Sequence, residues 1–333
     1  MTKPSPFLII TSITLIARTI IAVTRTNWLI IWLAIELNLI SFIPVINRST
    51  NFQETEASVK YLLTQALGSS LLILRRISIW LFNQIIPNIV IILLFSLLIK
   101  IGIAPCHFWY PSVITSIGWI PALILSTWQK LAPLSIMSFL LTKLSPSLIL
   151  VLASLNAITG GLIGINQSHL RTIIAYSSIT HIGWILALIY INIPLPTIIY
   201  FIIYSILITP IFLTLFKLNR KTLTQINAST IKLKNQYILL PILFLSLGGL
   251  PPLTGFFPKW FTIYLISPRS FILLIFLILG SLINLYFYLN IVFSIILRSY
   301  SININWNIET KFYSPNLIFI RTLCIPLVPL LII

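Results

Sequence analysis

Four charged side chains lie inside long apolar stretches of this 333-residue chain. Glu36 lies in WLIIWLAIELNLISFIP, Lys100 in IVIILLFSLLIKIGIAP, Lys130 in PALILSTWQKLAPLSIM and Lys259 in LGGLPPLTGFFPKWFTIYL. An ionisable group at membrane depth costs about 2.5–3.5 kcal/mol on insertion scales. Because only 8% of the residues are charged, these four positions indicate a path for protons or ions.

The chemistry of such a path depends on how a lysine is paired. Burial disfavours the ammonium form of lysine, and a nearby carboxylate favours it. Movement of the partner can therefore switch a buried lysine between charged and neutral, as a proton relay requires. Glu36 is the only acid deep in an apolar stretch, and we expect it to pair with Lys100. The structural alternatives are that Lys100 and Lys130 snorkel to the membrane surface, or that Lys259 binds carbonyls freed by a helix break.

Three further residues are candidates for the relay. His107 lies in APCHFW and His181 in SSITHIGW, and histidine titrates near neutral pH. A hydrogen-bonded packing role explains each histidine equally well. Lys60 follows Glu54 and Glu56; a charge cluster at the membrane surface is the simplest interpretation, and a gate on the relay is the alternative.

The elements that must position these residues are membrane helices. The chain is 58% hydrophobic with a mean hydropathy of +1.07, which excludes a soluble domain, and its continuous apolar runs do not alternate as β-barrel strands do. We predict a single all-α, polytopic membrane domain over 1–333, with about eleven transmembrane helices on the length rule. The predicted spans are 6–23, 27–46, 57–80, 87–109, 118–142, 147–165, 169–190, 196–216, 236–266, 271–297 and 315–333.

Two of these spans contain helix-breaking residues. Gly102 and Pro105 interrupt the fourth span, and Gly248–Pro252 interrupts the ninth. Interrupted segments at corresponding positions in two halves are typical of transport sites built on inverted repeats. We therefore expect a first five-helix repeat over 6–142, a second over 147–297 and a C-terminal helix over 315–333.

Charge distribution and motifs limit the remaining possibilities. The formal charge of +17 is spread over short loops and spans, which argues against nucleic-acid binding. Loop lysines and arginines are more numerous on the N-terminal side, so that side should face the cytoplasm or its organellar equivalent.

Cys106 and Cys324 lack CxxC spacing, and no nucleotide, haem, flavin, iron–sulfur or metal motif occurs. We predict no cofactor, no metal and no soluble small-molecule substrate bound by this chain.

Several segments together resemble a known family. They are IWLAIELNLISFIP, EASVKYLLTQALGSSLL, KIGIAPCHFWYPSV, TWQKLAP, LRTIIAYSSITHIGW and LSLGGLPPLTGFFPKW. This ordered set closely resembles the subunit 2 family of mitochondrial NADH dehydrogenase, the antiporter-like membrane subunits of respiratory complex I. The resemblance extends over nearly the whole chain. Cys106 departs from the usual APFHFW motif.

The resemblance implies roles and a setting. Glu36 matches the family's membrane glutamate, Lys100 its paired lysine on a broken helix, Lys130 the central lysine, and Lys259 the lysine of the second broken helix. It implies a proton-translocating subunit of NADH:ubiquinone reductase in the mitochondrial inner membrane, with its N-terminus on the matrix side. FMN, iron–sulfur clusters and redox chemistry would belong to other subunits, and the partners would be other complex I membrane subunits and the lipid bilayer.

Two other functions remain open. A free-standing cation/proton antiporter of the related family would use the same residues without redox subunits. A non-transporting membrane scaffold would tolerate replacement of Lys100, Lys130 and Lys259. Co-purification with flavin and iron–sulfur subunits separates the first alternative from a complex I subunit.

The arginines in or near the spans are unusual for the family. Arg18, Arg25, Arg75 and Arg76 stand where family members have small or polar residues, and methionine occurs only twice. In many invertebrate mitochondria AGA and AGG specify serine and AUA specifies methionine. We therefore expect serine at these four positions of the natural protein; the alternative is a genuinely arginine-bearing, isoleucine-rich relative.

Overall fold

The described part of the chain is helical. A computed structural model describes residues 6–48, 51–82, 87–141, 146–218, 222, 234–251 and 253–302. The predicted span 315–333, Cys324 and Lys143 lie outside these residues, as do the side chains of Arg75 and Arg76. The all-α prediction is confirmed for the described residues, whose elements are all helices.

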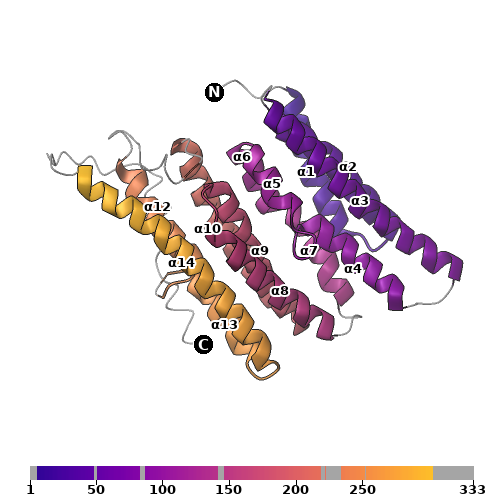
Figure 1. Cartoon of the computed structure of the whole chain (residues 1–333). Coiled ribbons are helices and arrows are strands. Elements are labelled where there is room, and N and C mark those ends of the chain that lie inside the picture. The colour runs from indigo at the N-terminus through magenta and orange to yellow at the C-terminus, as the bar shows by residue number, and fades with distance from the viewer. Residues whose placement is uncertain are drawn as a thin grey trace. The chain divides into compact units, whose positions relative to one another are not determined.

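The chain divides into two compact units, Met1–Ile149 and Leu150–Ile333, which are described separately. The helices of the first unit in Figure 1 are α1 (Pro6–Thr24), α2 (Trp28–Ile46), α3 (Phe52–Phe82), α4 (Pro87–Ile101), α5 (Trp109–Ser116), α6 (Trp119–Ser126) and α7 (Trp128–Leu141). In this unit α1 packs on α2. Helix α3 contacts α2, α4 and α5, and helix α7 contacts α4 and α6.

The second unit is built around α9. Its helices are α8 (Pro146–Ile165, which begins just before the boundary), α9 (Leu170–Tyr190), α10 (Pro194–Leu218), α12 (Lys234–Gly248), α13 (Phe256–Ile266) and α14 (Phe271–Ile302). α9 contacts α10, α13 and α14, and 94% of its most apolar window is buried. Polar side chains on α9 therefore face protein rather than lipid.

Within the described ranges, seven helices are long and apolar enough to cross a membrane: α1, α2, the Phe52–Leu74 part of α3, the Ser147–Ile165 part of α8, α9, α10 and the Phe271–Ile296 part of α14. Ile91–Ile101 and Leu239–Gly248 are shorter apolar segments. A helix satisfies its own backbone hydrogen bonds, which is why helices can cross hydrocarbon. The chain is thus a multi-pass membrane protein, and the number eleven remains a prediction.

Helices end at both predicted breaks, and they end in the same way. α4 ends at Ile101, and Gly102 follows with φ 74°; α12 ends at Gly248, and Gly249 follows with φ 81°. Glycine adopts this left-handed backbone without steric cost and commonly closes helices. The Leu98 carbonyl accepts from the amides of residues 102 and 103, and the Leu245 carbonyl accepts from those of residues 249 and 250.

One predicted span is divided where no break was expected. The prediction of a single helix over 118–142 is wrong, because α6 ends at Ser126 and α7 begins at Trp128. Between them, the amide and the hydroxyl of Thr127 both donate to the Leu123 carbonyl, at 3.1 and 2.8 Å. Pro133 inside α7 lacks an N–H and crowds the carbonyl four residues earlier, which weakens helix continuity nearby. The break places Lys130 in the first turn of α7.

Candidate proton-relay site

Lys100 is held at the end of α4 in the core of the first unit. It is 5% exposed, and its backbone carbonyl accepts a 3.3 Å hydrogen bond from Nε2 of Gln65 on α3. Gly68 leaves room for the lysine stem, because a Cβ there would lie 3.0 Å from Lys100 Cγ. The Nζ atom has no hydrogen-bond partner among the described residues. The Lys100 side chain is therefore enclosed by protein.

Glu36 interacts electrostatically with Lys100. The glutamate is half-buried on α2, and its Oε2 atom is buried without a hydrogen-bond partner in the described ranges. Among the described residues no direct ion pair joins these two side chains, in contrast to Lys60 and Glu56, whose charged atoms lie 2.6 Å apart. The acid and the lysine are thus near each other without a direct ion pair, and a small movement or an intervening water would change their interaction.

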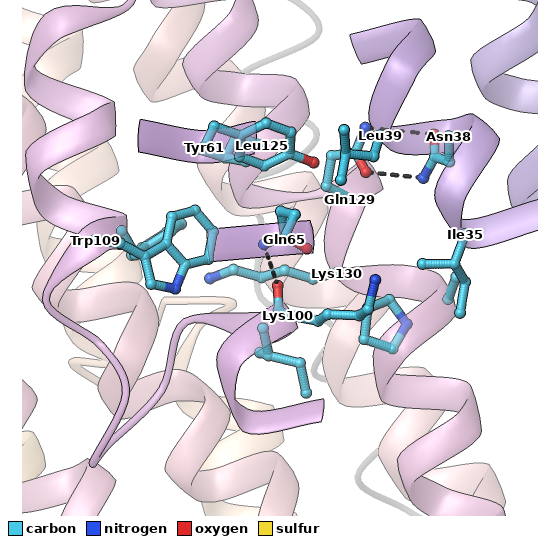
Figure 2. Close-up of a pocket in the computed structure, with 14 residues that line it drawn as sticks. Ile35, Asn38, Leu39, Tyr61, Gln65, Lys100, Trp109, Leu125, Gln129 and Lys130 are labelled. Carbon is cyan, nitrogen blue, oxygen red and sulfur yellow. Dashed lines mark hydrogen bonds between the residues drawn. The ribbon is translucent and has the colours of Figure 1, made fainter. Parts of the chain in front are cut away.

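Lys100 and Lys130 line the same cavity in the first unit (Figure 2). The cavity offers about 20 Å³ of room, which suffices for a water molecule. Asn38 and Gln129 form part of its polar wall and share a hydrogen bond of 2.9 Å. A buried water with such neighbours can bridge groups that do not touch directly. The two lysines thus share a cavity with room for one water molecule beside polar side chains.

Lys130 sits against an aromatic face. It is 2% exposed, and its Nζ atom lies 4.2 Å from the ring centroid of Tyr110 on α5. An ammonium over an aromatic ring is stabilised by the ring quadrupole without neutralisation of its charge. The ring therefore supports the charged form and leaves the proton available for exchange.

Lys259 lies in the second unit, on α13 beyond the break. It is 6% exposed, and its Nζ atom donates a 2.7 Å hydrogen bond to the Gly248 carbonyl. Gly248 is the last residue of α12. This contact is the carbonyl-binding role that the sequence left open. It is compatible with a relay role, because an ammonium has three donors.

The two candidate histidines have different surroundings. His107 follows the first break and stacks on Phe108 at 4.3 Å between ring centroids. Its ring lies near the Pro105 backbone, but neither ring nitrogen makes a hydrogen bond of standard geometry within the described residues. His181 is 4% exposed on α9, and its Nδ1 atom lies 3.0 Å from the Tyr200 hydroxyl. The hydrogen-bonded packing role therefore fits His181 better than His107.

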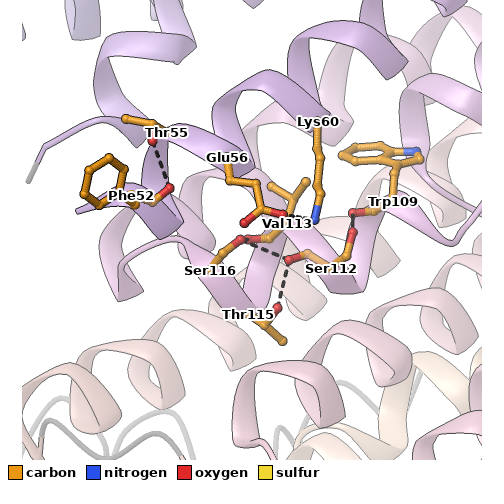
Figure 3. A network of polar contacts seen from close by, with 9 residues as sticks. All are labelled: Phe52, Thr55, Glu56, Lys60, Trp109, Ser112, Val113, Thr115 and Ser116. Atoms are coloured by element: carbon orange, nitrogen blue, oxygen red, sulfur yellow. Dashed lines mark hydrogen bonds and ion pairs between the residues drawn. The ribbon is translucent and has the colours of Figure 1, made fainter. Parts of the chain in front are cut away.

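Lys60 lies at the surface of the isolated chain. Its Nζ atom is 2.6 Å from Glu56 Oε1 on the same helix, and the two side chains are 49% and 64% exposed (Figure 3). An exposed pair of this kind contributes about 0–1 kcal/mol. The geometry fits a surface charge cluster. No group of three His, Cys, Asp or Glu side chains arranged as metal ligands occurs in the described residues.

Sequence reasoning missed the neutral partners of the relay. Tyr110, Gln65, Gln129 and Asn38 surround the lysines of the first unit. The side-chain amides of Gln65, Gln129 and Asn38 stand out inside apolar spans, and this was an available signal. The contact between these residues could not be predicted, because Asn38 and Gln129 are 91 residues apart in the sequence.

Comparisons with known proteins identify the family. Residues 25–284 match the family model described as NADH:quinone oxidoreductase/Mrp antiporter, TM. NADH-ubiquinone oxidoreductase chain 2 of Lumbricus terrestris is 48% identical over 291 residues, 87% of each chain. The protein of that name from Ovis aries is 38% identical over 343 residues, 97% of each chain.

Solved structures show the same fold at low sequence identity. A chain of respiratory complex I from Thermus thermophilus matches with a TM-score of 0.80 and 21% identity, over 89% of this chain and 72% of that one. A chain of the Mrp complex from Dietzia matches with a TM-score of 0.72 and 16% identity, over 87% and 59%. On the family model and the curated relatives together, this chain belongs to the NADH:quinone oxidoreductase/Mrp antiporter membrane family, in its branch of NADH-ubiquinone oxidoreductase chain 2 proteins.

Proposed function

We propose that the chain is a proton-translocating membrane subunit of respiratory complex I. In this proposal, other subunits oxidise NADH with ubiquinone, and this chain couples that reaction to proton transfer through Glu36, Lys100, Lys130 and Lys259. The observation that carries the proposal is the shared cavity of Lys100 and Lys130, with Glu36 in electrostatic range of Lys100. Relatives named as subunits of NADH-ubiquinone oxidoreductase support the assignment to the complex.

In the proposed relay, the group next to each lysine determines how strongly its ammonium form is stabilised. Lys100 is stabilised by a carboxylate, Lys130 by an aromatic ring and Lys259 by a carbonyl. Each partner favours the charged lysine to a different degree, so movement of Glu36 shifts the proton between Lys100 and the cavity. Three further residues have lesser roles in this proposal. Lys60 supplies an entry charge, and His107 and His181 are intermediate proton acceptors.

The repeat organisation is part of this proposal. Residues 6–142 and 147–297 form two inverted five-helix repeats, with 315–333 as a C-terminal helix. Support comes from the matching glycine closures at Gly102 and Gly249, each on the fourth predicted span of its half. Each break frees backbone groups beside a lysine, where water can be held.

The setting follows from the relatives. The chain would lie in the mitochondrial inner membrane among other complex I membrane subunits, and the FMN and iron–sulfur clusters would belong to the redox subunits of the complex. Its N-terminus would face the matrix. The Mrp match keeps the free-standing antiporter as a second candidate, because the same fold serves both.

Replacing the acid and its lysine in the intact complex tests the proposal. Glu36→Gln and Lys100→Met should each lower NADH:ubiquinone turnover and proton pumping together by about tenfold or more, since a positioned proton donor typically contributes at least that much. Glu56→Gln is the comparison variant: that glutamate is 64% exposed and pairs only with the entry charge Lys60, so the expected loss is smaller than for Glu36→Gln. Native gels measure assembly.

The outcomes separate the three functions. Loss of turnover and pumping in an assembled complex supports the relay. Loss of ion transport without any effect on redox turnover would favour an antiporter. Full turnover with a full proton gradient in both variants would leave the scaffold role.

A further inference from the structure

Two backbone carbonyls at the end of α4 accept hydrogen bonds from side chains of other helices. The Ile99 carbonyl accepts a 3.0 Å bond from Nε1 of Trp109 on α5. The Lys100 carbonyl accepts its 3.3 Å bond from Nε2 of Gln65 on α3 (Figure 2). We name Trp109 and Gln65 the carbonyl clamp. Both of its donors act on the backbone of the helical turn that carries Lys100.

The helix break leaves one of these carbonyls without its usual donor. In a continuous helix the Ile99 carbonyl would accept from the amide of Ile103. That amide instead bonds to the Leu98 carbonyl at 3.3 Å. A buried carbonyl without a donor destabilises a fold, and the indole of Trp109 supplies the donor that the break has removed.

The indole lies directly against the break. A Cβ atom on Gly102 would be 3.0 Å from Cζ2 of Trp109 and 2.8 Å from Cβ of Tyr110. A side chain at this glycine would therefore push the first turn of α5 away from the end of α4. Tyr61 on α3 packs on the other aromatic neighbour, with its ring centroid 5.9 Å from that of Trp109. These contacts fix the direction of the indole N–H.

The same surroundings hold the stem of Lys100 and leave its ammonium free. Gln65 binds the carbonyl of the lysine, and Gly68, on the same face of α3, lies against its stem, since a Cβ there would be 3.0 Å from Lys100 Cγ. The Nζ atom makes no hydrogen bond within the described residues. The backbone and the stem are thus fixed, while the ammonium can change its partner.

Packing alone does not account for the polar groups of the clamp. Gln65 is 6% exposed inside an apolar span, where a leucine or methionine would fill the space without the cost of burying an amide. The first turn of α5 also reaches the second lysine, because Tyr110 follows Trp109 and its ring lies 4.2 Å from Lys130 Nζ. A displacement of this turn would therefore disturb the supports of both lysines.

We propose that Trp109 and Gln65 are positioning residues, which hold Lys100 at the cavity that it shares with Lys130. This inference deepens the proposed proton-translocating function and rests on it. Neither clamp residue exchanges a proton. They fix where the Lys100 ammonium lies relative to Glu36 and the cavity, and proton transfer loses rate steeply when a donor is misplaced.

Removing single donors in the intact complex tests this role. Trp109→Phe keeps an aromatic ring and removes the N–H, and Gln65→Met keeps the chain length and removes the amide; Lys100→Met is measured in parallel. Trp32→Phe is the matched control for the indole, because Nε1 of Trp32 makes no hydrogen bond within the described residues. Gln53→Met is the control for the amide, because Gln53 is exposed on the same helix as Gln65.

The measurements separate positioning from folding. Turnover and proton pumping are determined per assembled complex on native gels, and turnover is resolved into kcat and the KM for ubiquinone. Each clamp variant is also made in the Lys100→Met background. Residues that act only through Lys100 have no further effect once that lysine is gone, whereas an independent structural lesion adds to the loss.

The expected result is a several-fold loss of kcat and of pumping in both clamp variants, with an unchanged KM, near-native controls and no further loss in the Lys100→Met background. Should Trp109→Phe not assemble, Gln65→Met is scored alone in the same way. Failure of both to assemble, or a further loss in the Lys100→Met background, assigns the clamp a structural role and overturns the proposal.

The lysine variant tells failure of the clamp from failure of the proposed function. Full kcat and full pumping in both assembled clamp variants, with loss in Lys100→Met, overturns the clamp and leaves the proposed function standing. Full kcat and full pumping in Lys100→Met as well overturns both.

Discussion

The Nζ atom of Lys259 lies 2.7 Å from the carbonyl oxygen of Gly248, across the break between α12 and α13. In a continuous helix that carbonyl would accept from the residue four positions later. That residue is Pro252, and proline has no N–H. The lysine thus supplies the donor that the proline lacks, and the break and the charge form one structural device.

This device separates two effects of replacing Lys259. Lys259→Met removes both donor and charge, and leaving a buried carbonyl unpaired costs about 1–3 kcal/mol. Lys259→Gln keeps a donor and removes the charge. We expect the Gln variant to assemble better than the Met variant on native gels, while both lose about tenfold in proton pumping, the order expected for a positioned acid or base. Full pumping in the Gln variant would show that the hydrogen bond, and not the charge, is what the protein needs.

The glycine closures give a second prediction. Gly249→Ala would force φ 81° on a residue with a side chain and place its Cβ 3.1 Å from Lys259 Nζ. A non-glycine residue in this region costs roughly 1–2 kcal/mol before any clash. We expect reduced thermal stability of the complex together with reduced pumping.

Gly118→Ala is the control for this substitution. Its φ of −65° suits alanine, and the nearest atom to an added Cβ is 3.6 Å away. Equal melting temperatures for Gly249→Ala and the native complex would contradict the strain argument.

The ring under Lys130 gives a third prediction. Tyr110→Leu removes the aromatic face 4.2 Å from the ammonium, a contact worth about 2 kcal/mol when desolvated. Tyr110→Phe keeps the face and is the matched control. We expect turnover to fall several-fold in the Leu variant and to stay near the native rate in the Phe variant, measured as NADH:ubiquinone activity of assembled complex. Equal rates in the two variants would remove Tyr110 from the relay.

The charged residues and two of the breaks could be predicted from the sequence because each violates a local rule. A lysine in an apolar run, or glycine and proline inside a span, is visible without a partner. The break at Thr127 could not be predicted, because TWQKLAP contains its proline six residues later and reads as continuous helix. Tyr110 and Tyr200 look like ordinary core aromatics, and only the tertiary structure brings the ring of Tyr110 to Lys130 and the hydroxyl of Tyr200 to His181.

The last prediction concerns the arginines near the spans. Arg18 is half-buried on α1, and Arg75 and Arg76 are neighbours on α3. A guanidinium inside a transmembrane span costs about 2.5–3.5 kcal/mol on insertion scales. Serine returns its hydroxyl to a carbonyl of its own helix, as Ser69 and Ser70 do on α3 at 2.8 and 2.9 Å.

We therefore expect peptide masses of the natural protein to show serine at positions 18, 25, 75 and 76, and methionine at many positions printed as isoleucine. Arg171 is the internal control: it is 6% exposed and has interaction partners, so its mass should be that of arginine. Tryptic cleavage after residues 75 and 76, with arginine masses there, would show that the guanidinium groups are real. Serine masses would instead lower the net charge of the protein by four and leave the buried lysines as the dominant positive charges of the relay.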